Sequence, residues 1–421
     1  MHGALRAGGF FVHAPSVPDS PAVAERLVLR RMQVSPSLYD LTPAAQLMLV
    51  GAVVALLPLA WILVRHRGGA GGERWQMLAR LLLFLTFDLV LFGAFTRLTD
   101  SGLGCPDWPG CYGNASPLGA RHEILAAETA MPSGPVTHGK AWIEMIHRYA
   151  ATSIGALITF MMIAAWWQRR RDPHSALSPA WASAVFVWVC VQGAFGALTV
   201  TLKLYPAIVT LHLLGGYLGL VLITVLARDR RQPAIAVSTG LRSAAWAMLA
   251  LLFLQSALGG WVSTNYAVLA CSEFPRCQGS WWPPMDFRHG FTVLRDLGAT
   301  AAGDLLPFAA LTAIHYVHRL GAYLVLACML VLAWALRRSD EPTLRGYGLA
   351  LAALAAWQLA SGLSNVVLGW PILAALSHTG GAGAAIVCVT ALLTRTRGER
   401  GAGASVAFRP GAAAGPAAAP R

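Results

Sequence analysis

The sequence predicts an all-α polytopic membrane protein with two parallel, pseudosymmetric four-helix bundles, which make eight core helices, and one accessory N-terminal helix. Three observations support this fold class. Hydrophobic residues make up 56% of the 421-residue chain and charged residues only 12%, whereas soluble domains are roughly 25% charged. Apolar runs of about 20 residues, long enough to cross a bilayer, recur along the chain. A set of short motifs also occurs twice in the same order.

Nine membrane spans are expected because the apolar runs are too long for barrel strands and do not alternate. In chain order they cover residues 45–64, 78–98, 142–167, 180–202, 207–227, 242–264, 311–336, 347–368 and 372–394. The predicted domains are a disordered arm (1–44), the accessory helix (45–66), an N-terminal half (78–228), a C-terminal half (241–395) and a disordered tail (396–421).

The net charge of +13 reports topology rather than a nucleic-acid partner, because the arginines collect in short loops between spans. These loops follow the first, third, fifth, seventh and ninth spans. Positive charge is retained in the cytoplasm, so the C-terminus is expected there. The two long loops, 99–141 and 265–310, then lie outside, where each cysteine pair meets an oxidising compartment.

The internal repeat pairs four signatures of the first half with four of the second. The matched stretches are Gly93–Arg97 with Gly259–Ser263, Cys105–Cys111 with Cys271–Cys277, His147-Arg148 with His318-Arg319, and His212 with His378. Gln192 and Gln358 follow the same order. Each unit has an even number of spans, so both halves have the same orientation in the membrane, unlike inverted transporter repeats.

Four histidines are the candidate ligands, namely His147, His212, His318 and His378. Each lies near the outer end of its span, on the second or fourth helix of a bundle. Facing helices of a bundle can present two imidazoles to one haem iron. A lone histidine at this depth is usually interfacial, but repeated ionisable groups within spans indicate function. Zinc is the alternative to haem iron as the bound metal, although the thiolate or carboxylate ligands expected of a zinc site do not accompany the histidines.

Three arginines are candidate contacts for haem propionates. Arg148 and Arg319 directly follow histidines, and Arg97 ends the second span. Arginine forms bidentate, charge-assisted bonds to carboxylates. Snorkelling to the membrane surface is the alternative interpretation.

One difference between the halves suggests where chemistry occurs. Glu144 precedes His147 by three residues, whereas His315 occupies that position before His318. Residues three apart share a helix face, so Glu144 would lie beside the first pair of histidines and transfer protons there. The alternative is an exposed glutamate at the water boundary.

The cysteine pairs Cys105/Cys111 and Cys271/Cys277 each have five intervening residues. Structural disulfides and a redox role both remain open.

The chain resembles the haem A synthase family over residues 78–394. The stretches that carry the resemblance are Gly93–Gly113, Glu144–Tyr149, Thr210–Tyr217, His318–Tyr323 and Ser377–Gly381. The resemblance implies eight helices in two halves and the oxidation of a methyl group of haem O to a formyl group, giving haem A for terminal oxidases.

By the same resemblance, His318 and His378 hold a resident haem b, His147 and His212 hold the substrate haem O, and Glu144 contributes to the reaction. The two cysteine pairs resemble a variant of the family that has both. The implied location is the inner membrane of a bacterium, with the cysteine loops periplasmic. The implied partners are a haem O synthase and oxidase assembly factors.

Two other functions explain parts of the pattern. A b-type membrane cytochrome that exchanges electrons with quinone would use the ligands but not Glu144, and a haem carrier would need no oxidation. The sequence leaves the oligomeric state open, a homo-oligomer included.

Overall fold

The computed structural model describes residues 41–65, 71–171, 178–228 and 232–398. Within these ranges, nine helices are long and apolar enough to cross a membrane, which confirms the predicted fold class. They are α2 (Thr42–Arg65), α3 (Gly71–Leu98), α5 (His138–Arg171), α6 (Pro179–Thr201), α7 (Pro206–Leu226), α8 (Thr239–Thr264), α10 (Phe308–Arg337), α11 (Pro342–Val367) and α12 (Ile372–Arg395). The protein is therefore a multi-pass membrane protein.

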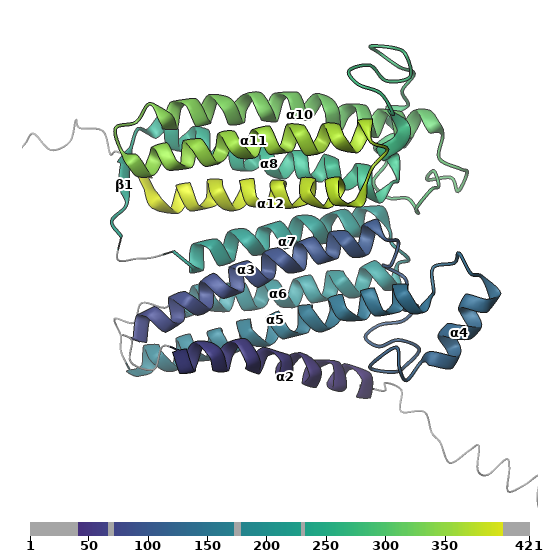
Figure 1. The fold of residues 1–421 in the computed structure, drawn as a ribbon, viewed down its shortest axis with the longest axis horizontal. Helices are drawn as coiled ribbons and strands as arrows, with labels where there is room; N and C mark the ends of the chain where they lie inside the picture. The colour runs from purple at the N-terminus through teal and green to yellow at the C-terminus, as the bar shows by residue number, and fades with distance from the viewer. Residues whose placement is uncertain (1–40, 66–70, 172–177, 229–231, 399–421) are drawn as a thin grey trace, which may run out of the picture. The chain divides into compact units, whose positions relative to one another are not determined.

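The eight core helices form two rings of four. Helices α3, α5, α6 and α7 pack around one another in the first half, as do α8, α10, α11 and α12 in the second. The halves meet where α3 and α7 contact α8 and α12, so helices near both ends of the chain lie side by side (Figure 1). This arrangement places one histidine-bearing helix pair in each ring.

The accessory helix α2 lies along α5, outside the first ring (Figure 1). Ala55 and Ile62 of α2 share a buried apolar cluster with Ile154 and Ile158 of α5. The helix begins at Thr42, three residues before the predicted start of the accessory helix; residues 1–40 of the predicted arm lie outside the described residues.

Local sequence sets several helix starts. Proline occupies the first turn of α6, α7 and α11, where its missing N–H has no intrahelical partner to lose. Ser178 and Ser238 cap α6 and α8 by accepting hydrogen bonds from Trp181 N and Leu241 N.

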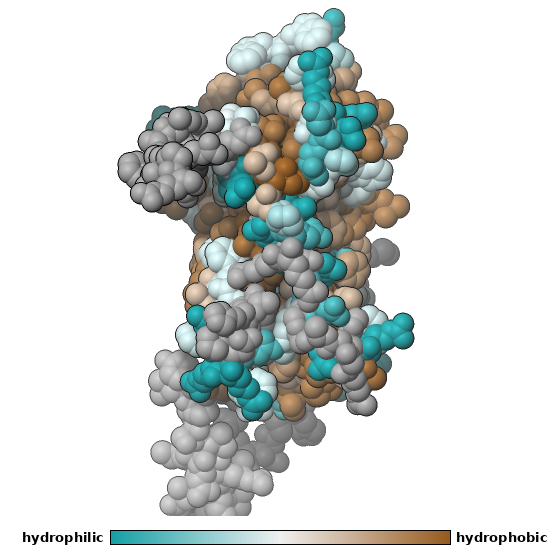
Figure 2. All heavy atoms as spheres, turned by 90° about the vertical axis from the view of Figure 1, so that its left-hand side faces the viewer, coloured by the Kyte–Doolittle hydropathy of each residue, from teal (hydrophilic) through white to brown (hydrophobic). Residues whose placement is uncertain are grey.

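One end of the bundle carries a small parallel pairing between β1 (Ile235–Val237) and β2 (Thr396–Gly398). Arg242 joins this contact by donating to the carbonyl oxygens of Leu393 and Thr396. Residues 396–398 were expected in the disordered tail but form β2, so that boundary is three residues too early; residues 399–421 lie outside the described ones. At this end, hydrophilic residues cross the face and apolar residues flank it (Figure 2).

The two cysteine loops lie at the opposite end, next to α4 (Arg121–Ala130), η1 (Ala267–Ala270) and α9 (Phe287–Gly290) (Figure 1). Each loop follows the first core helix of its half, α3 or α8, as the repeat predicts.

Candidate functional site

The four candidate histidines line one cavity of about 1240 Å³. His147 and His212 come from α5 and α7, and His318 and His378 come from α10 and α12. Pockets for a single drug-sized ligand usually measure roughly 300–1,000 Å³, so this space exceeds one such site. The structure thus brings all four predicted ligands to a shared interior space that spans both halves.

Each histidine faces a glycine of a neighbouring helix. A Cβ atom built on Gly93 would lie 3.1 Å from His147 Cε1, and one on Gly259 would lie 3.0 Å from His318 Cε1. The same relation holds for Gly196 with His212 at 3.5 Å and for Gly362 with His378 at 3.1 Å. These glycines leave the room that the imidazole rings occupy, and they recur at equivalent positions of the repeat.

The two histidines of the second half face each other across the cavity. The ring centroids of His318 and His378 are 6.4 Å apart, with the ring planes at 87°. In the first half, the His147 ring stacks on Phe92 with centroids 5.9 Å apart.

Two polar residues contact the second pair of rings and were missed in the sequence. Gln255 Nε2 lies 3.0 Å from His318 Nδ1, and Ser361 Oγ lies 3.0 Å from His378 Nδ1. The available signal was the difference between the halves, because the matched positions in the first half are Leu89 and Phe195.

Glu144 is buried and lines the cavity, so the exposed alternative is wrong. Its Oε2 accepts a hydrogen bond from Cys105 N at 2.8 Å, and its Oε1 accepts one from Arg148. In the second half, His315 Nδ1 lies 3.0 Å from Ala267 O and its Nε2 accepts from Arg319 Nε at 3.2 Å. Both residues therefore connect an arginine to an outer segment, but only the first half has a carboxylate there.

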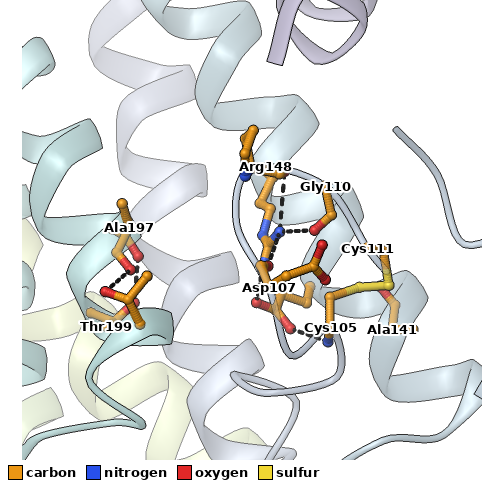
Figure 3. A network of polar contacts seen from close by, with 12 residues as sticks. Cys105, Asp107, Gly110, Cys111, Ala141, Arg148, Ala197 and Thr199 are labelled. Carbon is orange, nitrogen blue, oxygen red and sulfur yellow. Dashed lines mark hydrogen bonds and ion pairs between the residues drawn. A yellow bond between two sulfur atoms is a disulfide. The ribbon is translucent and has the colours of Figure 1, made fainter. Parts of the chain in front are cut away.

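Arg148 and Arg319 are buried and hold the cysteine loops, so snorkelling does not describe them. Arg148 Nη1 donates to the carbonyl oxygens of Asp107 at 3.0 Å and Gly110 at 2.5 Å, and Figure 3 shows the side chain pointing into this loop. Arg319 donates to the carbonyl oxygens of Cys271 at 2.7 Å and Glu273 at 2.8 Å. The predicted propionate contacts of these arginines would compete with the loop carbonyls, and they stay a prediction.

Arg97 joins the two halves at the end of the bundle that carries the cysteine loops. Its Nη2 donates to Ser263 O at 2.7 Å, and its guanidinium lies 4.0 Å from the centre of the Tyr266 ring. Asp100 accepts from both Arg97 and the Tyr266 hydroxyl. Burial raises the pKa of Tyr266, so the phenol keeps its proton and donates to Asp100. Arg97 also lines the cavity, and its propionate contact stays a prediction.

The cysteine pairs form the disulfides Cys105–Cys111 and Cys271–Cys277, each with a Cα–Cα distance of 4.8 Å. All four cysteines are buried. One aromatic residue of each loop, Trp108 or Phe274, lines the cavity. The disulfide loops therefore cover the space that the histidines share at this end of the bundle.

Comparison with known proteins identifies relatives that match most of this architecture. The family described as cytochrome oxidase assembly protein (COX15-CtaA) matches residues 75–391, which covers α3 to α12 except at their outer margins. A protein of Shewanella oneidensis named "Heme A synthase" is 37% identical over 311 residues, 72% of this chain and 91% of the relative.

Two further relatives carry the same name. The protein of Halalkalibacterium halodurans is 27% identical over 299 residues, 69% of this chain and 86% of the relative. That of Symbiobacterium thermophilum is 29% identical over 305 residues, 69% of this chain and 85% of the relative. The similarity therefore extends over nearly the full length of these proteins.

Proposed function

The chain belongs to the COX15-CtaA family of cytochrome oxidase assembly proteins, and from that premise we propose that it is a haem A synthase, which converts haem O to haem A. The relatives named "Heme A synthase" support this assignment. The single observation that carries it is the placement of His147, His212, His318 and His378 around one cavity, two in each half.

The spacing of the second pair fits a bis-histidine haem. Two metal–imidazole bonds of about 2 Å each, extended by about 1.1 Å from each ring nitrogen to its ring centre, place the centroids about 6 Å apart. His318 and His378 are 6.4 Å apart by this measure. Apolar residues dominate the lining of the cavity, which suits a porphyrin.

In this proposal, His318 and His378 hold a resident haem b, and His147 and His212 hold the substrate haem O. When bound, haem b supplies one-electron redox chemistry to the site. The remaining work belongs to side chains of the chain itself. The facing glycines set the positions of the imidazoles, and the disulfide loops cover the outer side of the cavity.

Glu144 is the proposed proton acceptor for oxidation of the haem O methyl group. As the partner of Arg148 and of Cys105 N–H, its carboxyl group is held at the cavity wall next to His147. Methyl oxidation would proceed through an alcohol and then a geminal diol, which loses water to give the formyl group. With water as the oxygen source, the net change is R–CH3 + H2O → R–CHO + 4 H+ + 4 e−, and an external oxidant takes up the four electrons. Each oxidation releases protons that a fixed carboxylate can accept.

The proposed setting is the inner membrane of a bacterium, with the cysteine loops periplasmic and the C-terminus cytoplasmic. The exposed arginines at the ends of α5 and α10, Arg169 to Arg171 and Arg337, lie at the end of the bundle opposite the cysteine loops, as the retention of positive charge requires. A haem O synthase as the source of substrate and oxidase assembly factors as recipients fit this setting.

The test is conversion of haem O by the purified full-length protein, followed by mass spectrometry of the extracted haem. Formation of hydroxylated and formyl haem is the expected result. The Glu144→Gln variant, which keeps an oxygen acceptor but lacks the charge, should lose ~100-fold or more in rate, within the range for a proton-transfer residue. The exposed Glu123→Gln serves as the matched control and should keep full activity.

Three outcomes separate the candidate functions. Product formation that depends on Glu144 supports the synthase. Unchanged haem O that is reduced and reoxidised reversibly would instead indicate a b-type cytochrome. Unchanged haem O that only binds and dissociates would indicate a carrier.

A further inference from the structure

The two histidine pairs differ in the residues that contact Nδ1, the ring nitrogen that does not bind iron. The part of the cavity around His147 and His212 is the first pocket, and the part around His318 and His378 is the second pocket. We propose that Gln255 and Ser361 are positioning residues that make the second pocket bind haem tightly. Leu89 and Phe195 at the matched positions leave haem in the first pocket weakly bound and exchangeable. This inference rests on the proposed function, because it explains how one haem stays resident while the other arrives and leaves.

Ser361 fixes the proton of His378. Its Oγ donates to Trp357 O at 2.7 Å, so the hydroxyl hydrogen is already engaged. The 3.0 Å contact with His378 Nδ1 therefore runs from Nδ1–H to the lone pair of Oγ. An imidazole with its proton on Nδ1 has a free Nε2, which is the form that binds iron.

Gln255 contacts Nδ1 of His318 as Ser361 contacts Nδ1 of His378. Its amide nitrogen lies 3.0 Å from His318 Nδ1 and 2.9 Å from His318 O, and its Oε1 is a buried acceptor without a partner among the described residues. A half-turn of the amide exchanges nitrogen for oxygen. This change gives up the hydrogen bond to His318 O and requires the amide to shift so that Oε1 moves away from that carbonyl oxygen. The amide then presents Oε1 to the Nδ1–H that iron binding at Nε2 requires.

The first pair has no such support. The Nδ1 atoms of His147 and His212 are buried, and no hydrogen-bond partner reaches them within the described part of the chain. The repeat explains this. Gly93 and Gly259 are equivalent, which matches Leu89 with Gln255, and His212 and His378 are equivalent, which matches Phe195 with Ser361. Neither a leucine nor a phenylalanine side chain can accept a hydrogen bond.

The consequence concerns both affinity and potential. A hydrogen bond to Nδ1–H orients the ring and makes the imidazole a stronger ligand, and its loss typically lowers metal affinity by about 10–100-fold. A stronger ligand also favours ferric over ferrous iron, so the potential of the second haem is lowered. The two pockets therefore differ in retention because of four side chains outside the ligand set.

The test measures haem transfer from the purified, haem-loaded full-length protein to excess apomyoglobin, together with the midpoint potential of the remaining haem. A His212→Ala background confines the measurement to the second pocket. We expect Ser361→Ala and Gln255→Leu each to speed transfer by ~10-fold or more and to raise the midpoint potential. Ser361→Thr, which keeps the hydroxyl, should restore both values.

Ser364→Ala is the matched control, because Ser364 Oγ lies one turn along α11 and donates to Ala360 O. It should change neither value. In the reverse direction, Leu89→Gln combined with Phe195→Ser in a His378→Ala background should slow haem transfer from the first pocket.

Unchanged transfer rate and potential in both Ser361→Ala and Gln255→Leu would overturn the inference, even if haem A is still made. Failure of the protein to bind haem in either pocket would instead overturn the proposed function. If Ser361→Ala or Gln255→Leu does not fold, the Ser361→Thr variant and the first-pocket variants still test the inference. A first pocket that gains both polar groups but releases haem no more slowly would contradict it.

Discussion

At the scale of single residues, the glycines opposite the ligand rings are as necessary as the histidines. A Cβ on residue 362 would lie 3.1 Å from His378 Cε1, which is closer than an ordinary van der Waals contact. Because protein interiors are close-packed, the neighbouring atoms have little room to move away. We expect Gly362→Ala to displace the imidazole and lower the haem content of the second pocket severalfold, as measured by the pyridine haemochrome assay.

Gly346 in the same helix provides the control for that variant. Nothing lies within 4 Å of a Cβ built there, and alanine favours a helix over glycine by ~1 kcal/mol. Gly346→Ala should therefore keep full haem content. Equal haem content in both variants would show that the close approach at Gly362 does not matter.

The buried pair of Arg148 and Glu144 makes a second prediction at this scale. Removing one partner of a buried ion pair costs about 3–5 kcal/mol, and Arg148 also donates to three carbonyl groups of the Cys105–Cys111 loop. Arg148→Met should lower the thermal stability of the protein and speed reduction of that disulfide by a thiol reagent.

The second half supplies the comparison, because Arg319 holds the other loop in the same way. Arg319→Met should speed reduction of Cys271–Cys277 and leave Cys105–Cys111 unaffected. Mass spectrometry after differential alkylation distinguishes the two. Equal reduction of both disulfides in either variant would contradict the separate anchoring of the loops.

At the scale of elements, the contact between α4 and α5 should depend on pH. The side chain and backbone amide of His138 donate to Glu128 Oε2 at 2.9 Å and 3.2 Å. These hydrogen bonds lower the pKa of Glu128 from 4.5. Because the pKa of Glu128 is lower in the folded than in the unfolded protein, the contact contributes its full stability at any pH above the unfolded-state pKa. That stability is lost as the pH falls through the folded-state pKa.

We therefore expect residues 121–138 to lose hydrogen-exchange protection below pH 4.5, after correction for the intrinsic exchange rate. Glu128→Gln should already be less protected near neutral pH and should lack this transition. Protection of wild type that stays constant through the acidic range would contradict the assignment.

Helix number and order were predictable from the sequence, but helix ends were less so. The apolar run predicts 142–167, whereas α5 runs from His138 to Arg171, because a helix continues into the aqueous boundary with polar side chains that hydropathy excludes. The pairing of β1 with β2 joins segments far apart in the chain, and neither three-residue strand has a periodic pattern to reveal it.

At the scale of the whole molecule, the repeat determines the fold, and its departures suggest where the halves differ in chemistry. The motifs shared by both halves predicted the histidine pairs and the helices that bear them. The roles of Arg148 and Arg319 in the loops were not predictable, because they depend on how residues about 40 positions away fold back. Gln255 and Ser361 were not predicted, because they lie at positions where the two halves differ and so belong to no shared motif.

The most direct test is a count of the haems bound in each half. The full-length protein is loaded with haem, and its haem content and low-spin ferric electron paramagnetic resonance signals are compared with those of His212→Ala and His378→Ala. We expect a bis-histidine haem in each half of wild type. Each variant should lose one of the two signals, and the two variants should lose different signals. Retention of both signals in either variant, or the same signal lost in both, would contradict the claim that each half holds its own porphyrin.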